Sequence, residues 1–383
     1  MADLSPLLPA GIYDLLPPEA EREASLVSKL LATLSAHGYE RVEPPLVEFE
    51  ETLLSGAGTA MATATFRMMD PASHRMIGVR ADMTTQIARI AATRLGLAPR
   101  PLRLSYAGEV LRTRASETSP ERQFGQVGAE LIGASAVAAD VEVIALAAEA
   151  LSAVGVKELS VDLTLPTLVP SLVAVYGLGE ERAAALRQAL DHKDAAAVKE
   201  AAGERASEFA RLLGAAGPAA AALAALDRLG LPHSAAAELR RLAAVQGGLE
   251  ASMPELKLTV DPVENRGFEY HSGISFAFFS RGGAGLGELG RGGRYEAGEP
   301  EMAEAATGFT FYTDRLLATL SEPRPRPRLL LPLGTDRAVA AALREAGWIT
   351  LAALEPAKDW RGEARRLRCL YLLEDGVPVK IDA

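Results

Sequence analysis

The sequence predicts an α+β fold in which antiparallel strands carry helices on one side. Three features indicate this fold: strand-like runs separated by turn-forming clusters, segments with apolar residues at helical spacing, and one long alanine-rich stretch between two groups of strands. With 383 residues, 49% of them hydrophobic and 23% charged, the chain is long enough for one large domain and one smaller domain.

The N-terminal part alternates helices with short strands. Apolar residues recur at helical spacing in 19–37, and a second helix is predicted over 82–94. A strand over 39–43 ends at a double proline, and the runs 65–69 and 76–79 flank the turn-forming cluster Asp-Pro-Ala-Ser-His. We therefore expect a helix, a strand, a hairpin and a second helix, in that order.

The middle of the chain contains two longer strands and a helical insertion. Residues 102–111 and 123–131 are strand-like, and the polar loop between them is of the kind that often holds ligands. The stretch 180–251 is rich in alanine and poor in aromatic residues, which predicts an inserted helical subdomain.

The last strands of the large domain are predicted at 256–260, 273–279 and 308–312, with glycine-rich turns between them and a helix over 314–320. An alternating Pro-Arg segment over 323–328 then predicts a stiff linker before a small α/β tail. We therefore expect two domains, 1–322 and 323–383.

Charge and cysteine content narrow the classes of function. A net charge of −10 without a basic block argues against a transfer-RNA partner. The single cysteine, Cys369, forms neither an internal disulfide nor a thiolate cluster. The first residues show no basic stretch followed by an apolar run, and no segment offers about 18 uninterrupted apolar residues. We therefore expect a cytoplasmic protein without a membrane span, a metal site or a cofactor.

Two polar features stand on the long strands. Arg112 follows the first strand, where its guanidinium is suited to binding a carboxylate or phosphate but equally suited to a surface ion pair. On the second strand, Gln126 and Glu130 share one face by period-two alternation. That face is either solvated or buried against a ligand with one donor and one acceptor, such as a neutral imidazole.

A dense polar segment, Asn265-Arg-Gly-Phe-Glu-Tyr-His271-Ser-Gly273, precedes an apolar strand and is typical of a binding edge. A turn with incidental charges is the alternative, and a single histidine is more often structural than catalytic. The glycine-rich runs over 282–287 and 290–295 permit close backbone approach, but they match neither a phosphate-binding P-loop nor a dinucleotide fingerprint in its required context.

Taken in order, these segments resemble the catalytic domain of histidyl-tRNA synthetase, a class II aminoacyl-tRNA synthetase, from about Pro9 to Leu320. The resemblance implies a class II synthetase-like fold and a histidine pocket. The positions that it assigns to this pocket are Asp82, Thr84, Arg112, Gln126, Glu130, Arg266, Tyr270 and His271. In the family, a glutamate stands in place of Asp82 and a tyrosine in place of His271.

Several positions depart from the synthetase pattern. Arg114 stands where the family has a glutamate that accepts a hydrogen bond from adenine, and a guanidinium has no acceptor. Tyr312 replaces a small glycine near the nucleotide, and the tail after Leu329 is much shorter than the family's anticodon-binding domain. These departures predict that the histidine pocket no longer adjoins a working ATP-binding site.

The combination resembles the regulatory subunits of ATP phosphoribosyltransferase, which are paralogues of the synthetase. This resemblance implies a non-catalytic subunit, a homodimer within a hetero-oligomer, that supports a short-form catalytic subunit and lets histidine inhibit the first step of histidine biosynthesis. Two other classes of function remain open. One is a free-standing histidine-activating enzyme, and the other is a scaffold with a vestigial pocket.

Overall fold

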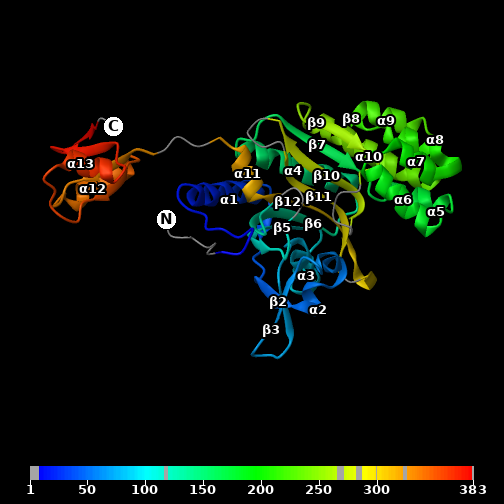
Figure 1. The fold of residues 1–383 in the computed structure, drawn as a ribbon, viewed down its shortest axis with the longest axis horizontal. Coiled ribbons are helices and arrows are strands. Elements are labelled where there is room, and N and C mark those ends of the chain that lie inside the picture. The colour runs from blue at the N-terminus through cyan, green and yellow to red at the C-terminus, as the bar shows by residue number, and fades with distance from the viewer. Residues whose placement is uncertain are drawn as a thin grey trace, which may run out of the picture. The chain divides into compact units, whose positions relative to one another are not determined.

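The computed structural model describes residues 8–115, 120–264, 271–281, 287–298, 300–321 and 326–381. The chain divides into two compact units, Met1–Ser321 and Glu322–Ala383. The first contains a nine-stranded sheet with the strand order β1-β5-β6-β12-β11-β10-β7-β9-β8 (Figure 1). In that order its strands are Glu40–Arg41, Leu102–Leu111, Gln123–Ile132, Glu304–Tyr312, Gly287–Ala297, His271–Ser280, Leu159–Thr164, Lys257–Asp261 and Gly217–Pro218.

The core of this sheet confirms the predicted antiparallel α+β architecture. All pairs from β5 to β7 are antiparallel, whereas β1 pairs with β5 and β7 pairs with β9 in parallel. Helices α1 (Glu19–Ala36), α4 (Val137–Ala153) and α11 (Thr313–Thr319) contact the central strands. Their apolar side chains join strand residues such as Val127 and Phe309 in one large core. We call this side of the sheet the core face.

The opposite side, here called the polar face, follows from the pairing register. One row across the sheet contains Thr164, Ser275, Gly293, Gly308 and Glu130 at directly opposed positions. Since successive side chains of a strand point to opposite sides, this row lies away from the phenylalanines of the core face. Helix α3 (Thr84–Thr93) contacts β6 and β11. Its Ile87 packs in a second apolar cluster with Tyr106 and Tyr295.

A small sheet carries the predicted hairpin. Its order is β2 (Val47–Phe49), β4 (Met76–Val79) and β3 (Phe66–Met69), and both pairs are antiparallel. In the turn, Asp70 donates from its backbone N–H to Arg75 at 2.9 Å and accepts from the Ser73 backbone N–H at 3.0 Å. A short helix α2 (Glu50–Leu53) and a 3₁₀ turn η1 (Gly56–Met61) connect β2 to β3.

The alanine-rich stretch 180–251 forms helices α6 to α10, as predicted, together with one short strand, and helix α5 precedes it. Helices α5 to α10 span Leu168–Val175, Glu180–Asp191, Ala195–Ala202, Ala206–Leu213, Ala219–Asp227 and His233–Ser252, and a 3₁₀ turn η2 covers Gly203–Arg205. The two residues of β8 extend the main sheet by pairing with β9, which composition alone did not predict. None of the helices formed by the described residues is long and apolar enough to span a bilayer.

One sequence prediction was wrong: the glycine-rich run before residue 298 was expected to be a turn, but its described part forms strand β11. The glycines fit here because the neighbouring chains lie very close. A Cβ added to Gly292 would lie 2.1 Å from the Gly308 carbonyl oxygen and 2.5 Å from the Phe276 ring. Tertiary packing has therefore overridden the low strand propensity of glycine.

A buried charge cluster ties β11 to two helices. Asp140 of α4 is 1% exposed. One of its carboxylate oxygens accepts from Arg294 Nε at 2.9 Å, and the other accepts from Arg241 Nη2 of α10 at 2.7 Å. Two guanidinium groups thus neutralise one buried carboxylate.

The second unit is a small α/β domain with the strand order β14 (Ile349–Ala352), β13 (Arg328–Leu331), β15 (Tyr371–Glu374) and β16 (Val377–Lys380). Helices α12 (Arg337–Glu345) and α13 (Trp360–Arg366) accompany it. Leu330 belongs to one apolar cluster, and Leu329 and Leu331 belong to another, so each side of the sheet has its own core.

Candidate functional site

A buried carboxylate and an amide meet where the loop before α3 reaches the polar face. The Asp82 carboxylate accepts from Gln126 Nε2 at 2.8 Å and from the Thr84 backbone N–H at 2.9 Å. Gln126 Oε1 in turn accepts from the Met83 backbone N–H at 3.0 Å. Asp82 is 1% exposed and Gln126 is not exposed. The face carrying Gln126 is therefore buried, and the solvated alternative is wrong.

Glu130 is the second buried carboxylate of the site. Its Oε2 accepts from the Tyr295 hydroxyl at 2.9 Å, and its Oε1 accepts from the Tyr106 hydroxyl at 3.2 Å. Burial raises the pKa of Glu130 to about 8, an effect that the nearby Asp82 carboxylate strengthens and the hydrogen bond from Tyr295 opposes. The Tyr106 hydroxyl also lies 3.2 Å from Thr84 Oγ1 and 2.8 Å from Thr310 Oγ1, so it links the two ends of the site.

The space between these groups is almost filled. A pocket lined by Thr84, Glu130, His271 and Tyr295 retains about 10 Å³, roughly the volume that one water-sized probe occupies. The glycine beneath it is obligatory, because a Cβ on Gly308 would lie 1.7 Å from Glu130 Oε2. Burial, together with the positive charge of Arg291, lowers the pKa of His271 to about 4, so this histidine is neutral at pH 7.

A chain of stacked side chains runs along the neighbouring edge of the site. Arg112 Cζ lies 4.9 Å from the centre of the Phe124 ring, and its Nε donates to the Ala81 carbonyl at 3.2 Å. The Phe124 ring meets the Tyr312 ring edge-on with centres 5.8 Å apart, and Arg315 Cζ lies 4.4 Å from the Tyr312 ring centre. Tyr312 is 4% exposed, so its ring fills the space between Phe124 and Arg315.

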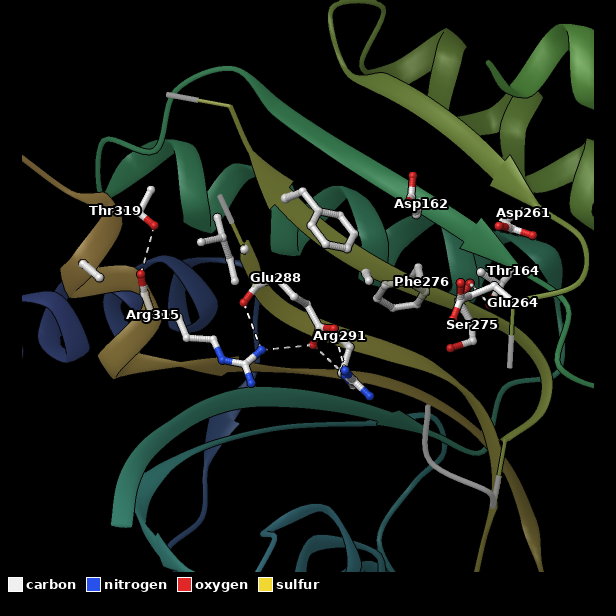
Figure 2. A pocket seen from close by; sticks show the side chains of 15 residues that line it. Asp162, Thr164, Asp261, Glu264, Ser275, Phe276, Glu288, Arg291, Arg315 and Thr319 are labelled. Atoms are coloured by element: carbon white, nitrogen blue, oxygen red, sulfur yellow. Dashed lines mark hydrogen bonds and ion pairs between the residues drawn. The ribbon is translucent and has the colours of Figure 1, made fainter. Parts of the chain in front are cut away.

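A larger cavity adjoins this site on the polar face. It has a volume of about 620 Å³, and Arg291 and Gly287–Leu289 of β11 line it together with residues of β7, β10 and α11 (Figure 2). Arg291 also lines the small pocket at Glu130. The two spaces are therefore neighbours with one shared side chain.

The structure brings together five of the eight residues predicted for the pocket: Asp82, Thr84, Gln126, Glu130 and His271. Arg112 lies beside them, bonded to the carbonyl next to Asp82. Arg266 and Tyr270 belong to residues 265–270, which lie outside the described residues.

Sequence reasoning missed the site roles of Tyr106, Tyr295 and Thr310. Tyr106 lies in a strand-like run and had no visible partner, since its contacts are with residues at sequence separations of 22, 24 and 204. The period-two pattern gives the face of each strand but not its neighbour. Finding these contacts requires the pairing register of β5, β6, β12 and β11, which the sequence pattern does not provide.

Comparison with known proteins identifies the class to which this fold belongs. The family model described as histidyl-tRNA synthetase matches residues 11–316. A structure from Bacillus halodurans, an ATP phosphoribosyltransferase regulatory subunit/histidyl-tRNA synthetase, superimposes with a TM-score of 0.80 at 26% identity, covering 94% of this chain and 95% of that one. A histidyl-tRNA synthetase from Nostoc sp. has a TM-score of 0.79 at 17% identity, covering 97% and 91%. The fold is therefore of the class II histidyl-tRNA synthetase type.

Sequence relatives narrow this class. An ATP phosphoribosyltransferase regulatory subunit from Paramagnetospirillum magneticum is 56% identical over 97% of both chains. Another, from Rhodospirillum centenum, is 54% identical over 97% of this chain and 95% of the relative. The chain belongs to the family of ATP phosphoribosyltransferase regulatory subunits.

Proposed function

We propose that this chain is a non-catalytic subunit that binds histidine and transmits its presence to an ATP phosphoribosyltransferase. The partner is a short-form catalytic subunit whose activity depends on this chain and is inhibited by histidine, in the first step of histidine biosynthesis. The names of the relatives support a catalytic partner. We further propose a homodimer within a cytoplasmic hetero-oligomer, without transfer RNA.

The observation that carries the proposal is the pair of buried carboxylates at opposite ends of one network. Asp82, held by Gln126 and Thr84, is suited to an ammonium group. Glu130 is suited to an imidazole nitrogen, either as an acceptor when ionised or as a donor when protonated. An ammonium group and an imidazole at the two ends of one small molecule are the recognition elements of histidine.

The near-complete filling of the pocket fits a regulator. About 10 Å³ does not accommodate an amino acid, so binding requires side chains to move away from Glu130. Arg291 is one lining residue that reaches beyond the pocket, since it forms an ion pair with Glu288. A ligand that binds only when these side chains have moved away shifts the population toward that conformation, which is the physical basis of allosteric control.

The positions that would contact ATP in a synthetase support a non-catalytic role. Arg114, at the position expected to recognise adenine, is exposed. Tyr312 fills the gap between Phe124 and Arg315 with a ring of the chain itself. We also propose that residues 1–322, with the helical insertion at about 180–251, form the ligand-binding domain and that 323–383 form a separate domain.

The test is to co-purify the chain with a short-form catalytic subunit and to measure phosphoribosyl transfer with and without histidine. Gln126→Ala and Glu130→Ala should each relieve inhibition at least tenfold while leaving the complex intact, whereas Gln188→Ala, at an exposed helical position, should behave as wild type. Unchanged inhibition in both pocket variants would reject the pocket.

Two further measurements separate the other classes of function. ATP–pyrophosphate exchange that depends on histidine would identify a histidine-activating enzyme and contradict a regulatory role. Absence of both calorimetric heat and thermal stabilisation with histidine, in the presence of the partner, would instead identify a scaffold.

A further inference from the structure

The 620 Å³ cavity beside the pocket has the size of a small-molecule site and two ends of opposite charge. Figure 2 shows Arg315 and Glu288 toward one end, with Arg291 bonded to Glu288, and Asp261 and Glu264 toward the other end. The cavity is built on the rigid strands β7, β10 and β11. It is distinct from the pocket around Glu130, which lies further along the same face.

The cationic end consists of two guanidinium groups around one carboxylate. Arg291 donates from Nε to Glu288 Oε1 at 2.6 Å, and a second bond joins its Nη2 to Glu288 Oε2. Arg315 donates from Nη1 to the Glu288 carbonyl at 3.1 Å and lies 3.5 Å from the carboxylate. The side chains of Arg291 and Arg315 are 23% and 19% exposed, so their positive charges lie in a partly desolvated setting.

The acidic end contains Asp162, Asp261 and Glu264. Lys193 lies 2.6 Å from Asp261 and 4.0 Å from Glu264, so one cation stands among three carboxylates. Burial raises the pKa of Asp162, and the carboxylates of Asp261 and Glu264 raise it further. A bound cation would relieve this repulsion.

The strand register sets the distance between the ends. Asp162 pairs with Ala277, which pairs with Arg291. Two inter-strand spacings separate the backbones of Asp162 and Arg291 by about 10 Å. The small Ala277 side chain forms the floor between the ends, and the Phe279 side chain adds an apolar wall.

We infer that this cavity is a second ligand site, selective for a basic amino acid such as L-arginine or L-lysine. The α-carboxylate lies between Arg291 and Arg315, and the α-ammonium group meets Glu288. The aliphatic stem crosses Ala277, and the terminal cation reaches Asp162 and Asp261. Every charge of such a ligand then has an opposite charge in the cavity.

Calorimetry on the full chain tests the ligand chemistry. L-Arginine and L-lysine should bind, while citrulline, which has the size of arginine without its terminal charge, should bind at least tenfold more weakly. Agmatine, which lacks the carboxylate, should also lose at least tenfold. The inference is overturned if neither basic amino acid binds at concentrations up to about 10 mM, or if citrulline binds as tightly as arginine.

Variants locate the site and separate it from the proposed histidine pocket. Asp162→Asn should weaken arginine binding at least tenfold and leave histidine affinity unchanged, whereas the exposed control Asp227→Asn should change neither. Asp261→Asn is a second variant, and thermal unfolding checks that each protein is folded. Wild-type arginine affinity in both cavity variants, or full displacement of arginine by histidine, overturns the inference. Should both variants unfold, the comparison of arginine with citrulline and agmatine decides.

Discussion

The buried carboxyl of Glu130 should make the stability of this chain depend on pH in a direction opposite to that of most acidic residues. The pKa of Glu130 is about 8 in the folded protein, against 4.5 for an ordinary glutamate side chain. Between these values the folded protein holds a proton that the unfolded chain has released. The contribution of Glu130 is therefore fully present below about pH 4.5 and is lost as the pH rises through 8.

The substitution Glu130→Gln isolates this effect because glutamine retains an acceptor for the Tyr295 hydroxyl but does not titrate. At about 1.4 kcal/mol for each pH unit, the difference between the two pKa values corresponds to about 4 kcal/mol between pH 5 and pH 9. The variant should thus gain about 4 kcal/mol of stability relative to wild type over this range.

Urea unfolding at pH 5, 7 and 9, followed by far-UV circular dichroism, measures this difference. Both tryptophans, Trp348 and Trp360, belong to the second unit, so their fluorescence monitors that unit separately. The low pKa of His271, about 4, affects stability only as the pH falls below 6.5, and it does so equally in both proteins. Parallel pH profiles for wild type and Glu130→Gln would refute the assignment of a raised pKa to this carboxyl.

Three further substitutions test interactions that stabilise the first unit. Asp140→Ala should cost about 3 to 5 kcal/mol, since it leaves two guanidinium groups without their buried carboxylate; a loss below about 1 kcal/mol in urea unfolding would contradict this. Gly128→Ala should cost about 3 kcal/mol or more, because the new Cβ would lie 2.4 Å from the Tyr106 hydroxyl; an unchanged thermal midpoint would show that Tyr106 moves freely. Asp194→Ala removes the cap of α7, where the side chain accepts from two backbone N–H groups, and should cost about 1 kcal/mol, whereas Asp194→Asn should cost little. Equal stability of the alanine and asparagine variants would count against the capping role.

Much of the fold could be predicted because local pattern and tertiary environment agree. The hairpin β3–β4 and the long strands β5 and β6 match their predicted positions to within a residue. The strand β11 could not be predicted, because its glycines are tolerated only through contacts with Gly308 and Phe276 that lie far away in sequence or across the sheet. Strand propensity is a property of the single residue, whereas in β11 the neighbouring strands determine the conformation.

The site was predictable in part for the same reason. Alternation placed Gln126 and Glu130 on one face, but it could not show that Asp82 would cover Gln126 or that Tyr295 would reach Glu130. The second cavity has no local signature at all, since Glu288 meets Arg315 at a sequence separation of 27. Its charges converge only when β11 and α11 are placed in space.

The pairing of β6 with β12 fixes more than the position of two strands. Gly308 and Thr310 face the site, while Phe309 and Phe311 fill the core between them. Because successive side chains alternate in direction, a shift of β12 by one residue would insert both phenylalanines into the pocket and bury a threonine hydroxyl in the core. Inserting or deleting a single residue in this strand would therefore disrupt the pocket and the core together. Evolution can change this pocket by substitution, but not by changing the length of β12.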